Sequence, residues 1–244
     1  RPMKTPNPSL VSNAFAGALV LLSAAASAFA APAPAEARAL RVGTLSATPG
    51  QKVSGLIEVQ HPAGGTAIPV TLVCGAAPGR VLALVAGVHG YEYPPILALH
   101  RLAAALDPAL LSGSLIIVPI ANLPAFQKRM IYYGPSDWKN LNRVFPGKPD
   151  GSLSERIAHV LTREVVGACD ALIDLHCGDG NEALIPYSYW MISGDPKLDA
   201  ESKELALAFG IETIIIDESR TKDPARSLYL GNTAALSGKP AVTT

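Results

Sequence analysis

The apolar run from Val81 to Val88 is the feature that most constrains the fold. It has the length of a strand and carries no polar side chain. Such a run is typical of a strand that is buried on both faces of a parallel sheet. Residues 115–120, 171–175 and 211–216 are predicted as further strands. The sequence therefore predicts a central sheet that is covered on both sides.

Helical segments are predicted between these strands. Residues 94–106 carry apolar side chains at helical spacing behind two prolines, which a first helical turn tolerates. Ser152 and Glu155 have the spacing of a capping box and open a second helix, and a third spans residues 198–209 and ends at Gly210. The alternation predicts an α/β fold with a mostly parallel or mixed central sheet and helices on both faces.

The first residues have a different character. An alanine-rich apolar run ends in Ala28-Phe29-Ala30, so residues 1–30 are predicted as a secretory signal peptide, with a retained membrane anchor as the alternative. Residues 31–39 are predicted as a Pro/Ala tether and residues 40–244 as the folded domain. This domain is expected to begin with an antiparallel pair of strands at 53–59 and 68–73. We expect an exported protein, periplasmic or secreted, with an uncleaved signal segment as its one possible membrane contact.

Charge and cysteine content narrow the class of partner. Lys plus Arg equals Asp plus Glu at 20 each, without long runs of either sign, which argues against a nucleic acid or an anionic membrane surface as a partner. A small-molecule or short-peptide substrate is the better expectation, and the sequence predicts no oligomeric state. Cys74, Cys169 and Cys177 do not form a disulfide framework and are predicted to be free and buried.

Polar side chains follow two of the predicted strands directly. His89 and Glu92 follow the first, while Asp174 and His176 end the segment 171–176. Ligands of open α/β sheets bind beyond the carboxyl ends of the strands, and two imidazoles with one carboxylate are a common set of ligands for catalytic zinc. Structural polar residues with satisfied hydrogen bonds are the alternative reading. His61, His100 and His159 are expected to be structural or surface residues.

The connection from Ala121 to Gly151 is too long for a plain linker. Loops of this length in compact domains more often carry function than stability. Asn142 and Arg143 lie within it, and Arg129 precedes them. An arginine can hold a carboxylate through two parallel hydrogen bonds or stabilise an oxyanion, although each of these two, taken alone, would be interpreted as a surface or salt-bridge arginine.

Four motifs carry a resemblance to a known family. In chain order, "GVHGYE", "KNLNRVFPG", "SERIA" and "LIDLHCGDGNE" resemble the succinylglutamate desuccinylase and aspartoacylase family of the zinc carboxypeptidase-like superfamily. The resemblance implies that His89, Glu92 and His176 bind one zinc ion per chain. It also implies that Asn142 and Arg143 receive a substrate carboxylate and that an arginine such as Arg129 polarises the scissile carbonyl.

The family pattern also differs from this chain. The spacing around Arg129 is unusual for the family. In relatives a glutamate that acts as general base follows a strand resembling "GKPAVTT", and the sequence ends at Thr244. We therefore expect the catalytic domain to be incomplete at its C-terminus and the chain as given to hydrolyse poorly. Glu155 is better explained as a capping residue, and Glu182 as a loop acid next to the site.

These observations favour a zinc-dependent hydrolase. The expected reaction is cleavage of an amide, less readily an ester, in a small carboxylate-bearing acyl compound such as an N-acyl amino acid. A carboxypeptidase-like enzyme on short or cell-wall peptides is one alternative, and a non-catalytic periplasmic metal- or solute-binding module is another. Asp174 is expected either to orient His176 or to be a buried structural acid. Tyr187, Tyr189 and Trp190 either line the pocket or pack in the core or at its rim.

Overall fold

The computed structural model describes residues 37–244. The predicted signal peptide and most of the predicted tether lie outside the described residues. Regular structure begins with a small hairpin of β1 (Leu40–Val42) and β2 (Leu45–Ala47), close to the predicted start of the folded domain. No helix within residues 37–244 has the length and apolar character needed to cross a bilayer.

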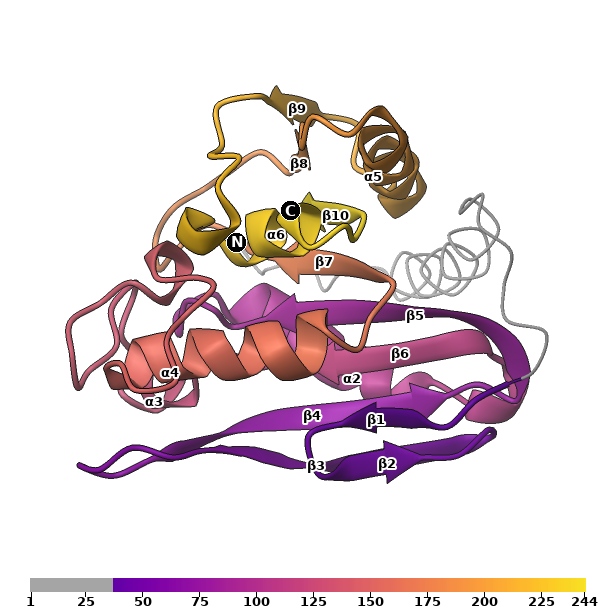
Figure 1. The fold of residues 1–244 in the computed structure, drawn as a ribbon, viewed down its shortest axis with the longest axis horizontal. Coiled ribbons are helices and arrows are strands. Elements are labelled where there is room, and N and C mark those ends of the chain that lie inside the picture. Colours follow the sequence, from indigo (N-terminus) through magenta and orange to yellow (C-terminus); the bar gives the residue numbers. More distant parts are fainter. Residues whose placement is uncertain (1–36) are drawn as a thin grey trace, which may run out of the picture.

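A mixed eight-stranded sheet forms the centre of the molecule (Figure 1). Its middle is parallel, because β5 pairs with both β6 and β7 in that sense, and β7 pairs in parallel with β10. At one edge of the sheet, β4 pairs antiparallel with both β3 and β6. Toward the other edge, β8 pairs antiparallel with β10. The strands, in order across the sheet, are β3 (Gln51–Val59), β4 (Thr66–Cys74), β6 (Ser112–Val118), β5 (Ala77–Ala86), β7 (Ala171–Leu175), β10 (Ala241–Thr243), β8 (Ser188–Met191) and β9 (Ile214–Asp217).

Helices cover both faces of this sheet, as the sequence predicted. On one face, α4 (Leu153–Val160) and α6 (Leu230–Leu236) pack against a core that includes Ala83 and Val85 of β5. On the other, α2 (Tyr93–Ala105) and α5 (Pro196–Phe209) pack against a second core that includes Leu84 and Ala86. Successive residues of β5 thus enter opposite cores, because side chains alternate across a strand. This explains why the run from Val81 to Val88 has no polar position.

Several boundaries differ from the sequence-based prediction. The strand predicted at 211–216 begins only at Ile214, since Gly210 caps α5 in the left-handed conformation and three residues then turn the chain. After α4 the chain continues as a π-helical turn, Leu161–Val166. The long connection holds the short helix α3 (Leu123–Gln127) and a 3-10 turn, Leu141–Arg143.

The cysteines form no disulfide bond within residues 37–244. All three cysteines are free; Cys74 and Cys169 are buried as predicted, while Cys177 is partly exposed, so the prediction for this residue was wrong. It lies beyond the end of β7, where the chain leaves the sheet.

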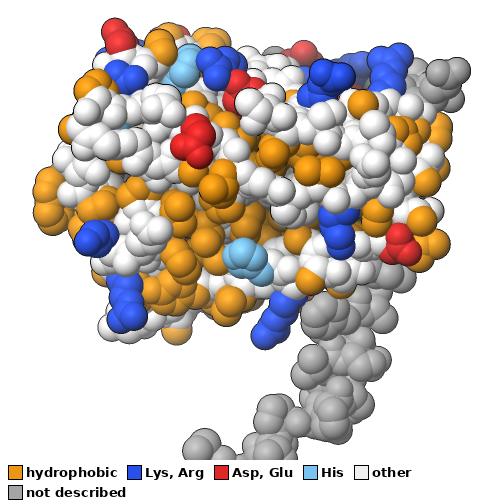
Figure 2. All heavy atoms as spheres, turned by 90° about the horizontal axis from the view of Figure 1, so that it is seen from below, with side chains coloured by type: hydrophobic (Ala, Val, Ile, Leu, Met, Phe, Trp, Pro, Cys, Tyr) orange, Lys and Arg blue, Asp and Glu red, His pale blue; other side chains and the backbone are white. Residues whose placement is uncertain are grey.

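On the face drawn in Figure 2, basic and acidic side chains are interspersed among hydrophobic ones, so this face has no extended patch of one charge.

Candidate metal and substrate site

The ends of the adjacent strands β5 and β7 bring His89, Glu92 and His176 together. The chain turns sharply after β5 at Gly87, which has a φ of 66°. Gly90 then lets the turn pack closely on α3, because a Cβ there would lie 2.3 Å from the backbone of Ala125. These two glycines hold His89 and Glu92 over the carboxyl end of the sheet, where His176 leaves β7.

The three side chains meet through their potential metal-binding atoms. Nδ1 of His89 lies 2.7 Å from Oε1 of Glu92, and Nδ1 of His176 lies 2.8 Å from Oε2 of the same carboxylate. All three groups offer ligand atoms within 4.8 Å of one another. Glu92 Oε2 is buried and accepts no hydrogen bond within residues 37–244, despite the nearby nitrogen. The group could therefore bind a metal ion, which would satisfy this oxygen.

The outer nitrogens of the two imidazoles have their own partners. His89 Nε2 lies 3.2 Å from Oδ1 of Asn140, an atom identified as the oxygen because it also accepts from the amide of Asn142. His176 Nε2 lies 3.1 Å from Oδ1 of the fully buried Asp174. Both contacts favour the tautomer with the proton on Nε2, which leaves each Nδ1 lone pair for a cation. Asp174 thus has the position of the orienting residue, one of its two predicted roles.

Protons and a metal ion compete for this group. Burial alone would raise the pKa of Glu92, but the two imidazoles beside it, those of His176 and His89, outweigh burial and hold that pKa below 4.5. Burial would lower the pKa of His176, but Asp174 and Glu92 outweigh it and hold it well above 6.5. Metal binding would displace a proton from the group, so metal affinity should rise with pH.

The loop that holds Asn142 and Arg143 lies against this group. Nδ2 of the buried Asn142 lies 3.4 Å from His176 Nε2, and its Oδ1 accepts a hydrogen bond of 3.0 Å from the amide of Leu230. The exposed Arg143 donates to the carbonyl of Asn142 and places its guanidinium 4.6 Å from the ring centroid of Tyr229. The structure therefore brings Asn142 to the metal group, and it places Arg143 beside Asn142 and Tyr229.

A second guanidinium, that of Arg220, contacts the same tyrosine. Arg220 lies 3.8 Å from the ring centroid of Tyr229, and its Nε donates to Asp217. Its loop is fixed by Asn232, which donates to the carbonyls of Thr221 and Ser227. Asp217 neutralises Arg220, whereas Arg143 has no carboxylate partner within residues 37–244, so the arginine pair retains a net positive charge.

Arg129 is not brought to the metal group. Its side chain is exposed, makes no hydrogen bond or ion pair within the described part of the chain, and follows α3 with a φ of 53°. Tyr132 instead contacts the group, because its ring packs edge-on against His89 with 5.5 Å between centroids. The predicted role of Arg129 on the scissile carbonyl receives no support from this placement.

The other sequence candidates have structural roles or lie at the rim. Glu155 accepts from the amide of Ser152 at the start of α4, as predicted. Trp190 donates to the carbonyl of Asp199 and packs on α5. Tyr189 lies against Arg220, and Tyr187 packs edge-on against Tyr189. Tyr187 also lines the cavity that contains His176, as one of the two predicted alternatives had it, whereas Tyr189 does not line it.

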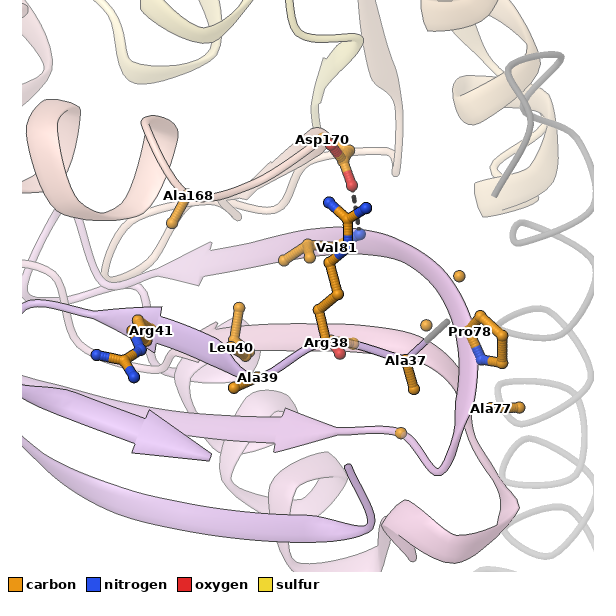
Figure 3. A pocket seen from close by; sticks show the side chains of 14 residues that line it. Ala37, Arg38, Ala39, Leu40, Arg41, Ala77, Pro78, Val81, Ala168 and Asp170 are labelled. Atoms are coloured by element: carbon orange, nitrogen blue, oxygen red, sulfur yellow. Dashed lines mark hydrogen bonds between the residues drawn. The ribbon is translucent and has the colours of Figure 1, made fainter. Parts of the chain in front are cut away.

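Two cavities differ in their relation to this group. A cavity of about 390 Å³ contains His176 and Thr244 and is walled mainly by apolar residues, including Leu184 and Ile185. The larger cavity, about 620 Å³, lies at the other end of the strands, among Arg38, Arg41 and the start of β5. Figure 3 shows it with Asp170, which accepts from the amide of Val81. Of these two cavities, only the smaller one is lined by a residue of the metal group, His176.

Comparison with known proteins places this arrangement in context. A family model described as the succinylglutamate desuccinylase/aspartoacylase catalytic domain matches residues 78–244. An N-alpha-acetyl-L-2,4-diaminobutyric acid deacetylase of Halomonas elongata is 40% identical over 147 residues, which cover 60% of this chain and 42% of that protein.

Solved structures of similar proteins support the same family assignment. An aspartoacylase family protein from Mesorhizobium loti is 30% identical with a TM-score of 0.70, over 81% of this chain and 61% of that one. The product-bound ectoine utilization protein EutE (DoeB) from Ruegeria pomeroyi is 32% identical with a TM-score of 0.68, over 79% and 58%. A metallo-carboxypeptidase from Burkholderia cenocepacia, at 18% identity and a TM-score of 0.54 over 78% and 54%, shares the fold alone. The chain thus spans less than two thirds of the length of each of these relatives.

Proposed function

Because the chain belongs to the succinylglutamate desuccinylase/aspartoacylase family, we propose that it is a zinc-dependent deacylase. The proposed reaction is hydrolysis of the amide bond of a small N-acyl compound that carries a carboxylate, such as an N-acyl amino acid. Export to the periplasm or beyond remains part of the proposal and rests on the predicted signal peptide, residues 1–30.

The observation that carries the proposal is the convergence of His89, Glu92 and His176. The Nδ1 atoms of both histidines lie within 2.8 Å of the Glu92 carboxylate. Their Nε2 atoms each contact an oxygen, which favours a proton on Nε2 and leaves Nδ1 free to bind a metal ion. A nitrogen, nitrogen, oxygen set fits zinc, which binds three protein ligands at catalytic sites and keeps a fourth position open. A bound zinc ion would supply Lewis acidity to a water and to the acyl carbonyl.

The chain's own residues would bind and orient the substrate. Arg143 and Arg220 flank Tyr229 and carry a net positive charge, so they suit a carboxylate. Asn142 contacts His176 and is tied to Leu230, which fixes the distance between the carboxylate site and the metal group. A substrate bound at both points would present its acyl bond to the metal group in one orientation.

The substrate of the Halomonas elongata relative supports this class. That protein is an N-acetyl deacetylase of an amino acid, and its substrate carries a carboxylate next to the acylated nitrogen. We propose the same general class, an N-acylated amino acid, for this chain.

Metal analysis and activity with defined variants test the proposal. Purified protein should bind about one zinc ion per chain, and both His89→Ala and His176→Ala should lose it. His100→Ala, a change on the exposed side of α2, is the matched control and should retain the metal. Undiminished zinc in both ligand variants would refute the site. Zinc-loaded protein that carries a glutamate after Thr244 and still releases no acyl group from any N-acyl amino acid would refute the activity.

A further inference from the structure

Asp179 is a buried carboxylate that the proposed mechanism does not use. It lies on the turn after β7, three residues beyond His176, and only 6% of its surface is exposed. Its Oδ1 is buried and has no hydrogen-bond partner within residues 37–244. A buried carboxylate oxygen without a donor costs free energy unless a ligand supplies the donor. The turn itself is closed by Glu182, whose side chain accepts from the amide of Asp179.

The surroundings of Asp179 place it beside the metal group. Tyr132 interacts with Asp179, and its ring packs edge-on against His89. Asp179 also interacts electrostatically with Glu92 and His89. The ring of Tyr91 lies next to Gly180, 3.4 Å from where a Cβ would be. The turn therefore presents a buried acid and an exposed one, Asp179 and Glu182, beside two tyrosine rings.

Carboxylates next to tyrosine rings are the chemistry that binds an ammonium group, through charge-assisted hydrogen bonds and cation–π contact. We propose that Asp179, with Glu182 in support, binds a cationic amine of the substrate. The substrate class is then an N-acylated amino acid whose side chain carries a second, free amine. This inference rests on the proposed deacylase function and deepens it, with Arg143 and Arg220 taking the carboxylate.

Calorimetric titration of zinc-loaded protein with paired ligands tests this proposal. The probes are Nα-methanesulfonyl derivatives, whose sulfonamide replaces the hydrolysable acyl bond. The 2,4-diaminobutyrate derivative is compared with that of norvaline, and the ornithine derivative with that of norleucine, so that each pair differs by an ammonium in place of a methyl group. The ammonium ligand of at least one pair should bind on the order of tenfold to hundredfold more tightly.

The Asp179→Asn variant should abolish this preference. Asparagine keeps an oxygen for Tyr132 but removes the charge, so the ratio within each pair should fall to about threefold or less, with zinc content unchanged. Asp150→Asn removes the same charge from an exposed position on the long loop and should leave the preference intact. Circular dichroism checks that each variant is folded. If Asp179→Asn does not fold, Glu182→Gln should lower the preference about twofold to threefold.

Three results would overturn the proposal: no ammonium preference in the unmodified protein, a preference that survives loss of the Asp179 charge, or loss of zinc from the Asp179→Asn variant. The third result would assign Asp179 to metal binding. The ligands cannot be hydrolysed, so the titration measures binding independently of catalysis. A protein that prefers the ammonium ligands but hydrolyses no substrate would therefore refute only the deacylase function. Hydrolysis of neutral N-acyl amino acids without any ammonium preference would refute only the amine site.

Discussion

The buried carboxylate of Asp174 lies 3.1 Å from Nε2 of His176, while Glu92 lies at Nδ1 of the same ring. His176 is thus held between two carboxylates. One belongs to the candidate metal group, and the other orients the imidazole. Neighbours that orient a ligand in this way contribute strongly to metal affinity although they do not touch the metal.

Replacing Asp174 should weaken metal binding without removing it. Asp174→Asn keeps the shape but loses the charge that favours a proton on Nε2, so zinc affinity should fall on the order of 10- to 100-fold. Competition with a chromophoric chelator measures the change. Asp170→Asn, at the opposite end of β7, is the control. An unchanged affinity in Asp174→Asn would make Asp174 a structural acid only.

The two guanidiniums on Tyr229 should act on the substrate carboxylate. Arg143→Met and Arg220→Met keep the apolar stems but lose the charges, so each should raise KM for a carboxylate-bearing substrate on the order of tenfold. The corresponding neutral amide should be affected much less. Arg226→Met, on the same loop as Arg220, is the control. Equal losses on the acid and the neutral amide would exclude carboxylate recognition.

The capping residue Glu155 should contribute stability that depends on pH. Hydrogen bonds from Lys139 and from the amide of Ser152 lower its pKa from 4.5 to about 2. Since the folded-state pKa lies below the unfolded value, this stability is fully present above pH 4.5 and is lost as the pH falls toward 2. The carboxylate is 15% exposed, and solvent screening limits the contribution to about 1–2 kcal/mol.

Urea unfolding of Glu155→Gln measures this contribution. The variant should be less stable than the unmodified protein at pH 7, and the difference should shrink on acidification between pH 4.5 and pH 2. Glu58→Gln, on the exposed face of β3, should show neither effect. A difference that stays constant across this range would mean that the charge of Glu155 is not responsible.

The family resemblance predicts that a glutamate placed directly after Thr244 would act as the general base. The carbonyl of Thr244 accepts from the amide of His176, and its own amide donates to the carbonyl of Asp174. The following side chain would therefore lie close to the metal group. A chain lengthened with glutamate at that position should hydrolyse N-acyl amino acids about 10²- to 10⁴-fold faster than one with glutamine there. Equal rates would show that another group takes the proton.

The sequence predicted the centre of the fold better than its loops. The strand from Val81 and the one at 171–175 were predictable because burial on both faces leaves an apolar run. Helix α6 was not predicted, since its Gly, Asn and Thr residues have weak helical propensity and packing against the sheet stabilises it instead. Strand β8 has four residues of mixed polarity, which give too short a pattern.

The candidate site was predictable only where it follows a strand end. His89, Glu92 and His176 have this signal, whereas Arg220 and Tyr229 reach the site because their loop docks on Asn142, a contact without a local pattern. Asp179 had a weak signal, since it stands three residues after a predicted ligand and three before Glu182. Its burial, which carries the amine-site proposal, could come only from the structure.

The position of β10 has a consequence for the order in which the protein folds. This three-residue strand lies between β7 and β8, although β8 and β9 precede it in the chain. Within the described residues, β8 and β9 join the main sheet through β10 alone. During synthesis from the N-terminus, these two strands therefore cannot join the sheet until residues 241–243 have emerged. The same docking step forms the hydrogen bond from the amide of His176 to the carbonyl of Thr244, so closure of the sheet also fixes the backbone of one residue of the metal group.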